Sequence, residues 1–350
     1  MLEYRRLGRT DLMVSSIMLG TMTWGQQNTE AEGHEQLDYA LAQGINFIDT
    51  AELYAIPPRA ETAGSTERII GTWLKARGGR DKVIIATKVA GRSGMTWIRD
   101  GQNTKLDRAN ITAAIEGSLM RLQTDYVDLY QLHWPDRAVP MFLDADNVFR
   151  SPPPVPDEVP IEETLGVLDD LVKAGKIRHV GLSNETAWGT ARFLQASELG
   201  RGPRMMSVQN AYNLVNRQYE TALAEFAGRE QVGLLAYSPL AQGYLTGKYQ
   251  GGARPPGART TLFDRGQRYE RPRVAEAIDE YLRIAKDFGL DPAQMALAFV
   301  TSRSFVTSNI IGATTMVQLR TDIGSLDVTI TPEIEKRIDA VHRAYTNPAP

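Results

Sequence analysis

Short apolar segments alternate along this chain with longer segments that have the periodicity of amphipathic helices, and this alternation constrains the fold most. The apolar segments cover residues 17–20, 46–49, 83–87, 127–132, 177–182, 206–209, 232–237 and 310–312. The helical segments between them cover residues 30–43, 65–76, 107–121, 161–174, 186–199 and 218–228. Eight strands that alternate with helices predict an α/β fold, a (β/α)8 TIM barrel. We expect an N-terminal β-hairpin and extra helices as additions to it.

Most of the predicted strands are continuous apolar runs, which is typical of parallel strands covered on both faces. A doubly wound fold is disfavoured, because no G-x-G-x-x-G motif occurs in the chain. The segment before the last strand holds a Pro/Gly/Arg-rich loop at 251–271 and helices at 274–288 and 292–303. A second long loop covers 135–160, and loops of this length are often functional. No polar linker divides the chain, so we predict one domain over residues 1–350.

Composition excludes several classes of protein. The net charge is −3 with scattered basic residues, which makes nucleic acid an unexpected partner. The chain has no cysteine, hence no disulfide, which fits a reducing compartment, and no apolar stretch approaches the ~20 residues of a membrane span. We therefore expect a cytoplasmic protein that does not bind membranes. The four histidines lack zinc-site spacing, so no metal site is predicted, and homo-oligomerisation is left open.

Polar residues that follow the apolar runs are the candidates for chemistry, because a barrel of this kind carries its active site at the carboxyl ends of its strands. Asp49 ends the second run, with Tyr54 five residues later, Lys88 follows the third, and His133 follows the fourth. A lysine ammonium beside a tyrosine lowers the phenol pKa from ~10, and a carboxylate keeps that lysine charged. Tyr54 can then donate a proton while His133 stabilises negative charge on a substrate oxygen. This combination predicts reduction of a carbonyl group.

A hydride source is needed, and the loops after the seventh and eighth strands are the usual phosphate sites of such barrels. The first loop starts at Tyr237, whose ring can stack on another ring, and ends at Lys248, a cation. The second runs from Gly312 into a helix. These features favour a nicotinamide dinucleotide.

Six motifs carry a resemblance to a known family. They are GTMTWG at 20–25, DTAELY at 49–54, ATK at 86–88, LHWP at 132–135, GLSN at 181–184, and AYSPL at 236–240 followed by GKY at 247–249. In order and spacing the chain resembles the aldo-keto reductase superfamily nearly end to end. Within it, the chain is most similar to the bacterial Tas-type reductases.

The resemblance implies an NADPH-dependent reductase of aldehydes and ketones in which Asp49, Tyr54, Lys88 and His133 are catalytic. It also implies the cofactor contacts, which are Thr21, Met22, Asp49, Ser183, Asn184, Gln209, Tyr237, Ser238, Pro239, Leu240, Gly243, Lys248, Arg259, Gly312, Thr314, Gln318 and Asp322. Of these, Ser183, Asn184 and Gln209 would hold the carboxamide and Tyr237 would stack on the nicotinamide. The expected contacts to a small carbonyl substrate are Trp24, Tyr54, His133 and Trp134.

The chain departs from the family pattern at the expected adenine contact. Many members carry Glu and Asn where this chain has Thr321 and Asp322. An aspartate cannot donate the amide hydrogen bonds of an asparagine. Adenine binding is therefore expected to be weaker or rearranged.

Two other functions are compatible with such a barrel. Lys88 could form a Schiff base with a carbonyl, as in aldolases. The chain could also be an NADPH-binding sensor subunit with little turnover, since potassium-channel β subunits share this architecture; His133 weighs against that reading, because those subunits differ there.

Overall fold

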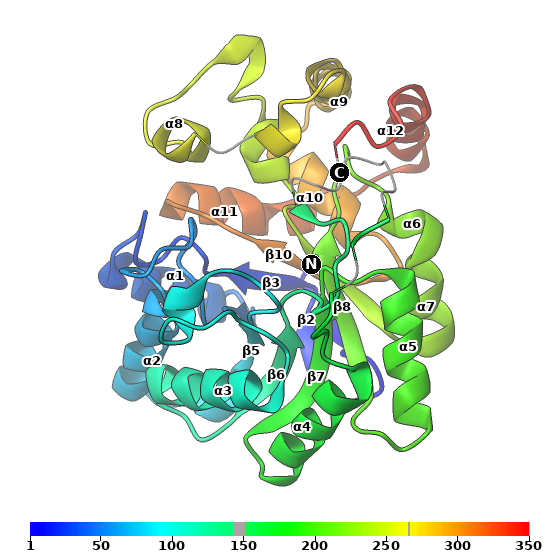
Figure 1. Cartoon of the computed structure of the whole chain (residues 1–350). Helices are drawn as coiled ribbons and strands as arrows, with labels where there is room; N and C mark the ends of the chain where they lie inside the picture. The colour runs from blue at the N-terminus through cyan, green and yellow to red at the C-terminus, as the bar shows by residue number, and fades with distance from the viewer. Residues whose placement is uncertain (143–150, 154, 265–266, 350) are drawn as a thin grey trace.

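The computed structural model describes residues 1–142, 151–153, 155–264 and 267–349. Within these residues, eight parallel strands close into a barrel in the order β10-β3-β4-β5-β6-β7-β8-β9 (Figure 1). The strands are β3 Ile17–Gly20, β4 Phe47–Asp49, β5 Ile84–Val89, β6 Val127–Leu132, β7 Ile177–Ser183, β8 Met205–Ala211, β9 Gly233–Tyr237 and β10 Val306–Ile311. The predicted TIM barrel is confirmed.

An antiparallel hairpin precedes the barrel, as predicted. It pairs β1 Tyr4–Arg6 with β2 Met13–Ser15. Its apolar side chains, among them Leu7 and Val14, pack with residues at the starts of the barrel strands. The hairpin therefore covers the amino end of the barrel, opposite the end expected to carry the site.

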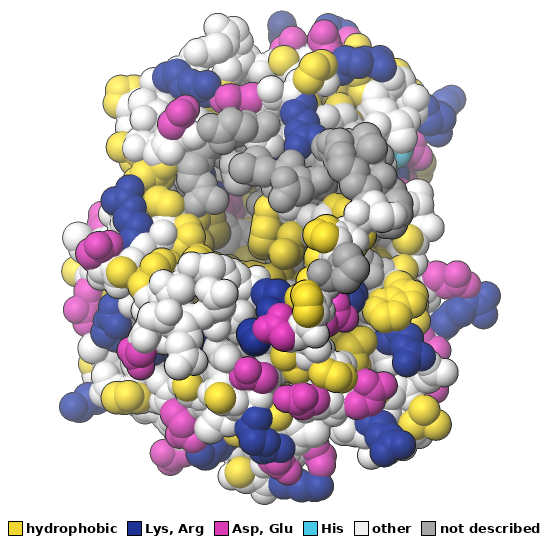
Figure 2. Space-filling view, in the orientation of Figure 1, with side chains coloured by type: hydrophobic (Ala, Val, Ile, Leu, Met, Phe, Trp, Pro, Cys, Tyr) yellow, Lys and Arg dark blue, Asp and Glu magenta, His cyan; other side chains and the backbone are white. Residues whose placement is uncertain are grey.

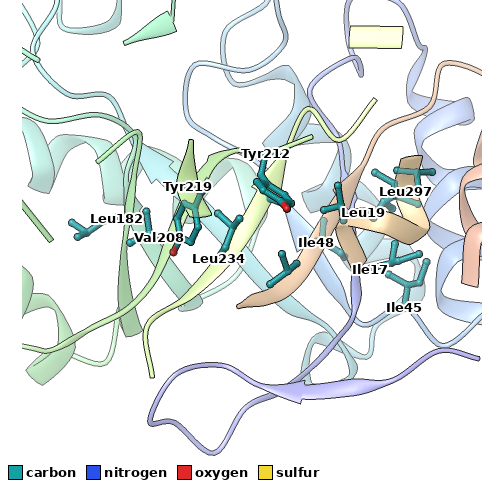
Figure 3. Packing of buried hydrophobic residues seen from close by; sticks show 14 of the residues in the cluster. Ile17, Leu19, Ile45, Ile48, Leu182, Val208, Tyr212, Tyr219, Leu234 and Leu297 are labelled. Carbon is teal, nitrogen blue, oxygen red and sulfur yellow. The ribbon is translucent and has the colours of Figure 1, made fainter. Parts of the chain in front are cut away.

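Helices surround the barrel, and most of them bury apolar side chains against its strands. Those that follow β3 to β8 are α1 Glu30–Ala42, α2 Ser65–Arg77, α3 Arg108–Leu122, α4 Ile161–Lys173, α5 Ala187–Glu198, α6 Tyr219–Ala222 and α7 Ala224–Glu230. Thr29, Asp107 and Thr186 begin three of them as N-caps, and each side chain accepts a hydrogen bond from the backbone amide three residues ahead. Figure 3 shows outward-pointing strand residues such as Ile48 and Leu234 in the resulting core.

The C-terminal part adds helices beyond the eightfold repeat: α8 Arg259–Phe263, α9 Val274–Asp287, α10 Pro292–Thr301, α11 Met316–Gly324 and α12 Pro332–Ala344. Figure 1 shows α8, α9 and α12 together on one side of the molecule, beyond α10 and α11. The sequence did not predict α12 or α8. In the described residues, no helix combines the length and apolar character needed to cross a membrane.

Two predicted elements have different bounds. The helix predicted over 218–228 is two short helices that meet at Leu223. The last strand begins at Val306 rather than at residue 310. Its first half contains polar residues, so it did not match the apolar pattern used to predict strands. Ser308 and Asn309 are buried there because each side chain is hydrogen-bonded, Ser308 to the Ser15 carbonyl and Asn309 to the Leu297 carbonyl. The predicted loop 135–160 lies partly outside the described residues.

Candidate active site

Polar side chains meet where three neighbouring strands end. Asp49 is the last residue of β4, Lys88 lies near the end of β5, and His133 directly follows β6. Tyr54 reaches the same place from the loop after β4, and its ring lies 5.7 Å from that of His133. The structure thus brings together all four residues that the sequence singled out, because neighbouring parallel strands end at the same end of the barrel.

Lys88 is the centre of this group and is 0% exposed. Its Nζ donates to Asp49 Oδ2 at 2.7 Å, to the Thr50 carbonyl at 2.8 Å and to the Tyr54 hydroxyl at 3.3 Å. Burial lowers the pKa of Lys88, while the charge and hydrogen bond of Asp49 oppose that change. All three ammonium protons are therefore directed to oxygen atoms, one of which belongs to Tyr54.

Tyr54 is held as a neutral phenol. Burial raises its pKa well above the ordinary value of 10.0, the nearby charge of Asp49 raises it further, and Arg259 opposes the rise. This corrects the sequence-based expectation that Lys88 lowers this pKa. The Lys88 charge is already balanced by Asp49, so the loss of hydration determines the direction.

His133 is also held neutral. Burial lowers its pKa well below the ordinary value, and the charge of Lys88 lowers it further. Among the described residues, its buried Nδ1 has no hydrogen-bond partner. A proton on Nδ1 would be buried without an acceptor, so the tautomer with its proton on Nε2 is favoured.

Amide side chains from β7 and β8 join this group. Gln209 Nε2 donates to Asp49 Oδ1 at 2.8 Å, and Ser183 Oγ donates to the Gln209 carbonyl at 2.8 Å. Asn184 Nδ2 donates to the His133 carbonyl at 2.8 Å, and Asn184 Oδ1 accepts from the Tyr237 hydroxyl at 2.6 Å. The expected carboxamide contacts thus lie beside the four polar residues and are linked to them by hydrogen bonds.

Comparison with known proteins agrees with this geometry. The model of the aldo/keto reductase family matches residues 16–343. The chain belongs to the aldo/keto reductase family.

Individual relatives match over nearly the whole chain. "Protein tas" of Escherichia coli is 50% identical over 351 residues, which cover 100% of both chains. "Uncharacterized oxidoreductase YrpG" of Bacillus subtilis is 33% identical over 97% of this chain and 96% of its own. A rice protein named "Probable voltage-gated potassium channel subunit beta" is 31% identical over 97% of this chain and 96% of its own. The predicted resemblance to the aldo-keto reductases and to Tas is confirmed.

In this aldo/keto reductase an apolar wall surrounds the Tyr54 ring. Trp134 is 5% exposed, lies 4.9 Å from the His133 ring, and is anchored by its Nε1 donating to the Arg92 carbonyl at 2.9 Å. Tyr54 and Trp134 belong to one hydrophobic cluster. Its other members are Ala51, Leu53, Ala90, Met22, Ile56, Met95, Ile98 and Met141. In Figure 2, hydrophobic side chains gather near the centre of the visible face.

Two predicted ligand contacts lie too deep to touch a ligand. Trp24 is 0% exposed and donates from Nε1 to Gln36 Oε1 at 3.2 Å, so it is a core residue and not part of a substrate opening. Thr21 is also 0% exposed, and its hydroxyl donates to the Asp49 carbonyl at 2.6 Å. The structure corrects both predictions: the loop after β3 turns these side chains inward, and Met22 between them stays partly exposed.

The loop after β9 has an irregular backbone. Ser238, Gln242 and Gly243 have positive φ angles of 53°, 57° and 95°. A Cβ on Gly243 would lie 2.7 Å from Lys248 Cε, so the lysine stem packs directly on this glycine. Pro239 is buried and Leu240 is partly buried. Turns of this kind present backbone N–H groups to anions, and Lys248 adds an exposed positive charge.

The loop after β10 leads into α11. Gly312 and Gln318 are exposed, and Gln318 Oε1 accepts from the Thr314 amide at 2.9 Å and the Thr314 hydroxyl at 3.0 Å. Thr315 begins the helix as its N-cap. Asp322, near the other end of α11, is 3% exposed. Seven of the predicted dinucleotide contacts therefore lie on the loops after β9 and β10, and Gln318 and Asp322 follow on α11.

Two residues near the site were missed from the sequence. Gln131 of β6 accepts from Gln209 Nε2 at 3.2 Å, and its own Nε2 is buried without a partner in the part of the chain that the structure describes. The sequence feature that could have revealed Gln131 is a polar residue inside an apolar run. It lies two positions before His133, and residues two apart on a strand point to the same face. Arg268 lies over the Tyr237 ring at 5.9 Å, and only the tertiary structure reveals this contact.

Proposed function

We propose that this protein is an NADPH-dependent reductase that converts aldehydes and ketones to alcohols, with Tyr54 as the proton donor. The observation that carries the proposal is the position of Lys88 Nζ between Asp49 Oδ2 and the Tyr54 hydroxyl. A bound reduced nicotinamide supplies the hydride to the carbonyl carbon.

The Tyr54 phenol suits reduction because it carries its proton at neutral pH. An alkoxide that forms on the substrate is a much stronger base than a phenolate, so a raised pKa does not prevent the transfer. As the proton leaves, negative charge develops on the Tyr54 oxygen, 3.3 Å from the Lys88 ammonium. Lys88 thus stabilises the phenolate at the moment it forms.

His133 acts on the same substrate oxygen as a neutral hydrogen-bond donor. Its lowered pKa and buried Nδ1 leave the Nε2 proton for this purpose. In a low-dielectric site such a donor stabilises the developing negative charge. Trp134, packed on the imidazole, fixes the ring and contributes to an apolar wall for the organic part of the substrate.

The donor set fits a nicotinamide dinucleotide. Asn184 and Gln209 carry the amide groups that a carboxamide needs, and the Ser183 hydroxyl lies beside them, within hydrogen-bond distance of Asn184 Nδ2 and of the Gln209 carbonyl. The ring of Tyr237 offers a face for stacking. Lys248, Arg259 and the turns at 238–243 fit the phosphates. The choice of NADPH over NADH rests on similarity to the family.

A Schiff-base aldolase is disfavoured by the position of Lys88. Its side chain is 0% exposed and forms an ion pair with Asp49 at 2.7 Å. A nucleophilic lysine needs a free amine that can reach the carbonyl carbon. The sensor function is tested by turnover, because a sensor binds the cofactor but reduces aldehydes very slowly.

The experiment compares wild type with Tyr54→Phe and with Tyr4→Phe, a control in the distant hairpin whose residue is 48% exposed. NADPH binding is followed by quenching of protein fluorescence, and turnover by NADPH oxidation with a panel of aromatic and aliphatic aldehydes. We expect Tyr54→Phe to bind NADPH and to lose at least about 100-fold in kcat, and Tyr4→Phe to match wild type. A fully active Tyr54→Phe enzyme contradicts the assignment of the acid, and a wild type that binds NADPH without turnover supports the sensor.

A further inference from the structure

Glu52 lies between Asp49 and Tyr54 in the loop after β4, and its carboxylate is buried. Its side chain is 3% exposed, and that of its partner Arg99 is 10% exposed. Arg99 Nη1 donates to Glu52 Oε2 and Arg99 Nη2 donates to Glu52 Oε1, each at 2.8 Å. The Ala90 amide donates to the same Oε1 at 2.7 Å. A pair of parallel hydrogen bonds of this kind fixes the orientation of the two side chains as well as their distance.

The Ala90 contact attaches the Tyr54 loop to the end of β5. The Glu52 amide donates to the Lys88 carbonyl at 3.2 Å, so the backbone and the side chain of Glu52 both bind this strand end. The Tyr54 amide donates to the Ala51 carbonyl at 3.1 Å, and the turn that this bond closes contains Glu52. The carboxylate therefore fixes the turn that carries the phenol against the strand that carries Lys88.

Arg99 attaches a second segment to the same turn. It directly follows the short helix η2 Thr96–Ile98, and its Nη2 also donates to the Asn110 carbonyl of α3 at 3.3 Å. Ile98, the residue before Arg99, belongs to the hydrophobic cluster around Tyr54. The ion pair thus joins the proposed proton donor to part of the apolar wall.

Packing alone does not explain a buried ion pair at this place. The removal of two charges from water is costly, and an apolar pair of similar volume is often at least as stable. An apolar side chain at position 52 would leave the Ala90 amide without its acceptor. A glutamine there could accept from Ala90, but its NH2 group would face the Arg99 guanidinium, which only donates. A carboxylate of this length supplies acceptors to both partners.

The geometry between Lys88 and Tyr54 is sensitive to small displacements. Their 3.3 Å contact is the longest of the three hydrogen bonds that Lys88 Nζ makes. Such bonds usually measure about 2.7–3.2 Å, so further separation removes the phenol from the ammonium. A displacement of about 1 Å in an active site can lower a rate by roughly 100-fold.

We propose that Glu52 and Arg99 are positioning residues for proton transfer, and that their ion pair holds the Tyr54 hydroxyl at the Lys88 ammonium. This inference rests on the proposed function. Both residues act through the turn at 51–54, and neither exchanges a proton itself. When the pair is broken, the turn separates from β5, the phenol moves away from Lys88, and protonation of the alkoxide slows. The loops after β9 and β10, which fit the cofactor phosphates, are unchanged.

The test compares wild type with Glu52→Gln and Arg99→Lys, and Asp128→Asn is the matched control. The Asp128 side chain is 2% exposed, and its Oδ2 accepts from Arg80 Nη2 at 2.8 Å and from the Ile85 amide at 2.9 Å. Like Glu52, it is a buried carboxylate bound to one arginine and to one backbone amide of β5. It lies at the amino end of that strand, opposite the candidate active site.

The measurements are the Kd of NADPH by fluorescence quenching, the single-turnover rate of NADPH oxidation with benzaldehyde, and the ratio of that rate in H2O and D2O. We expect Glu52→Gln and Arg99→Lys to bind NADPH as wild type does and to lose at least about tenfold in rate. The solvent isotope ratio should increase in both, because proton transfer from Tyr54 then limits the rate. Asp128→Asn should lower Tm and leave the rate and the ratio unchanged.

Every other outcome has a clear meaning. A wild-type rate in either Glu52→Gln or Arg99→Lys overturns the inference and leaves the reductase proposal intact. So does a loss of rate that Asp128→Asn shares, that comes with an unchanged isotope ratio, or that comes with weaker NADPH binding. A wild type that binds NADPH but oxidises it with no aldehyde overturns the proposed function and this inference with it. Should Glu52→Gln not fold, Arg99→Lys decides alone, because it keeps the positive charge and loses the paired hydrogen bonds.

Discussion

The Lys88 ammonium lies 2.7 Å from the Asp49 carboxylate, and both side chains are buried, at 0% and 5% exposure. The two residues are 39 positions apart in the chain and meet because β4 and β5 are neighbours in the barrel. A buried ion pair tolerates the loss of one partner poorly, because the remaining charge has no compensation.

Asp49→Asn should therefore destabilise the protein as well as impair turnover. We expect a loss of roughly 3–5 kcal/mol in the free energy of unfolding, measured by urea denaturation. Asp170→Asn is the matched control, because Asp170 pairs with Arg108 at 56% and 62% exposure and such pairs contribute about 1 kcal/mol or less. Equal effects of the two substitutions would contradict the importance of burial at Asp49.

The rate of carbonyl reduction should be nearly independent of pH from about 6 to 9. Tyr54 has a raised pKa and so remains a proton donor over this range, while His133 has a lowered pKa and so remains neutral. The measurement is kcat at saturating NADPH and aldehyde across the range. An acidic limb near pH 6.5 that disappears in His133→Gln would show that His133 titrates during catalysis.

Trp24 should matter for stability and not for substrate binding. Its ring is fully buried and its Nε1 donates to Gln36, so Trp24→Phe leaves an unsatisfied buried acceptor at a cost of roughly 1–3 kcal/mol. We expect a lower Tm with an unchanged KM for aldehydes. Trp134→Phe provides the contrast, with a changed KM, because Trp134 packs against His133.

Asp322 should reduce stability at alkaline pH. Its pKa is raised from 3.8 to about 8 on folding, so the folded state binds the proton more tightly, and stability falls as pH rises from about 4 to 8. Each unit of pKa difference corresponds to ~1.4 kcal/mol. Asp322→Asn should therefore be more stable than wild type at pH 9, with the difference shrinking toward pH 4. Denaturation at several pH values without cofactor measures this, and a constant difference would contradict it.

Much of the fold could be predicted from local pattern. Mainly apolar runs such as 127–132 and helix starts such as Asp107 depend on neighbours in the chain, and the structure has them where the sequence indicated. Val306 to Asn309 escaped prediction because the polar side chains in this segment are satisfied only by distant partners such as Ser15. The contact of Arg268 with the Tyr237 ring could not be predicted either, because the two residues are distant in the chain and meet only in the fold.

The sequence by itself determined that Asp49, Tyr54, Lys88 and His133 meet, because the repeat of strands and helices orders the strand ends around a barrel. It did not determine the protonation of these groups. Hydration depends on burial, and burial belongs to the whole fold, so only the tertiary structure decided that Tyr54 keeps its proton more firmly, that Trp24 lies in the core, and that Asp322 is an acid.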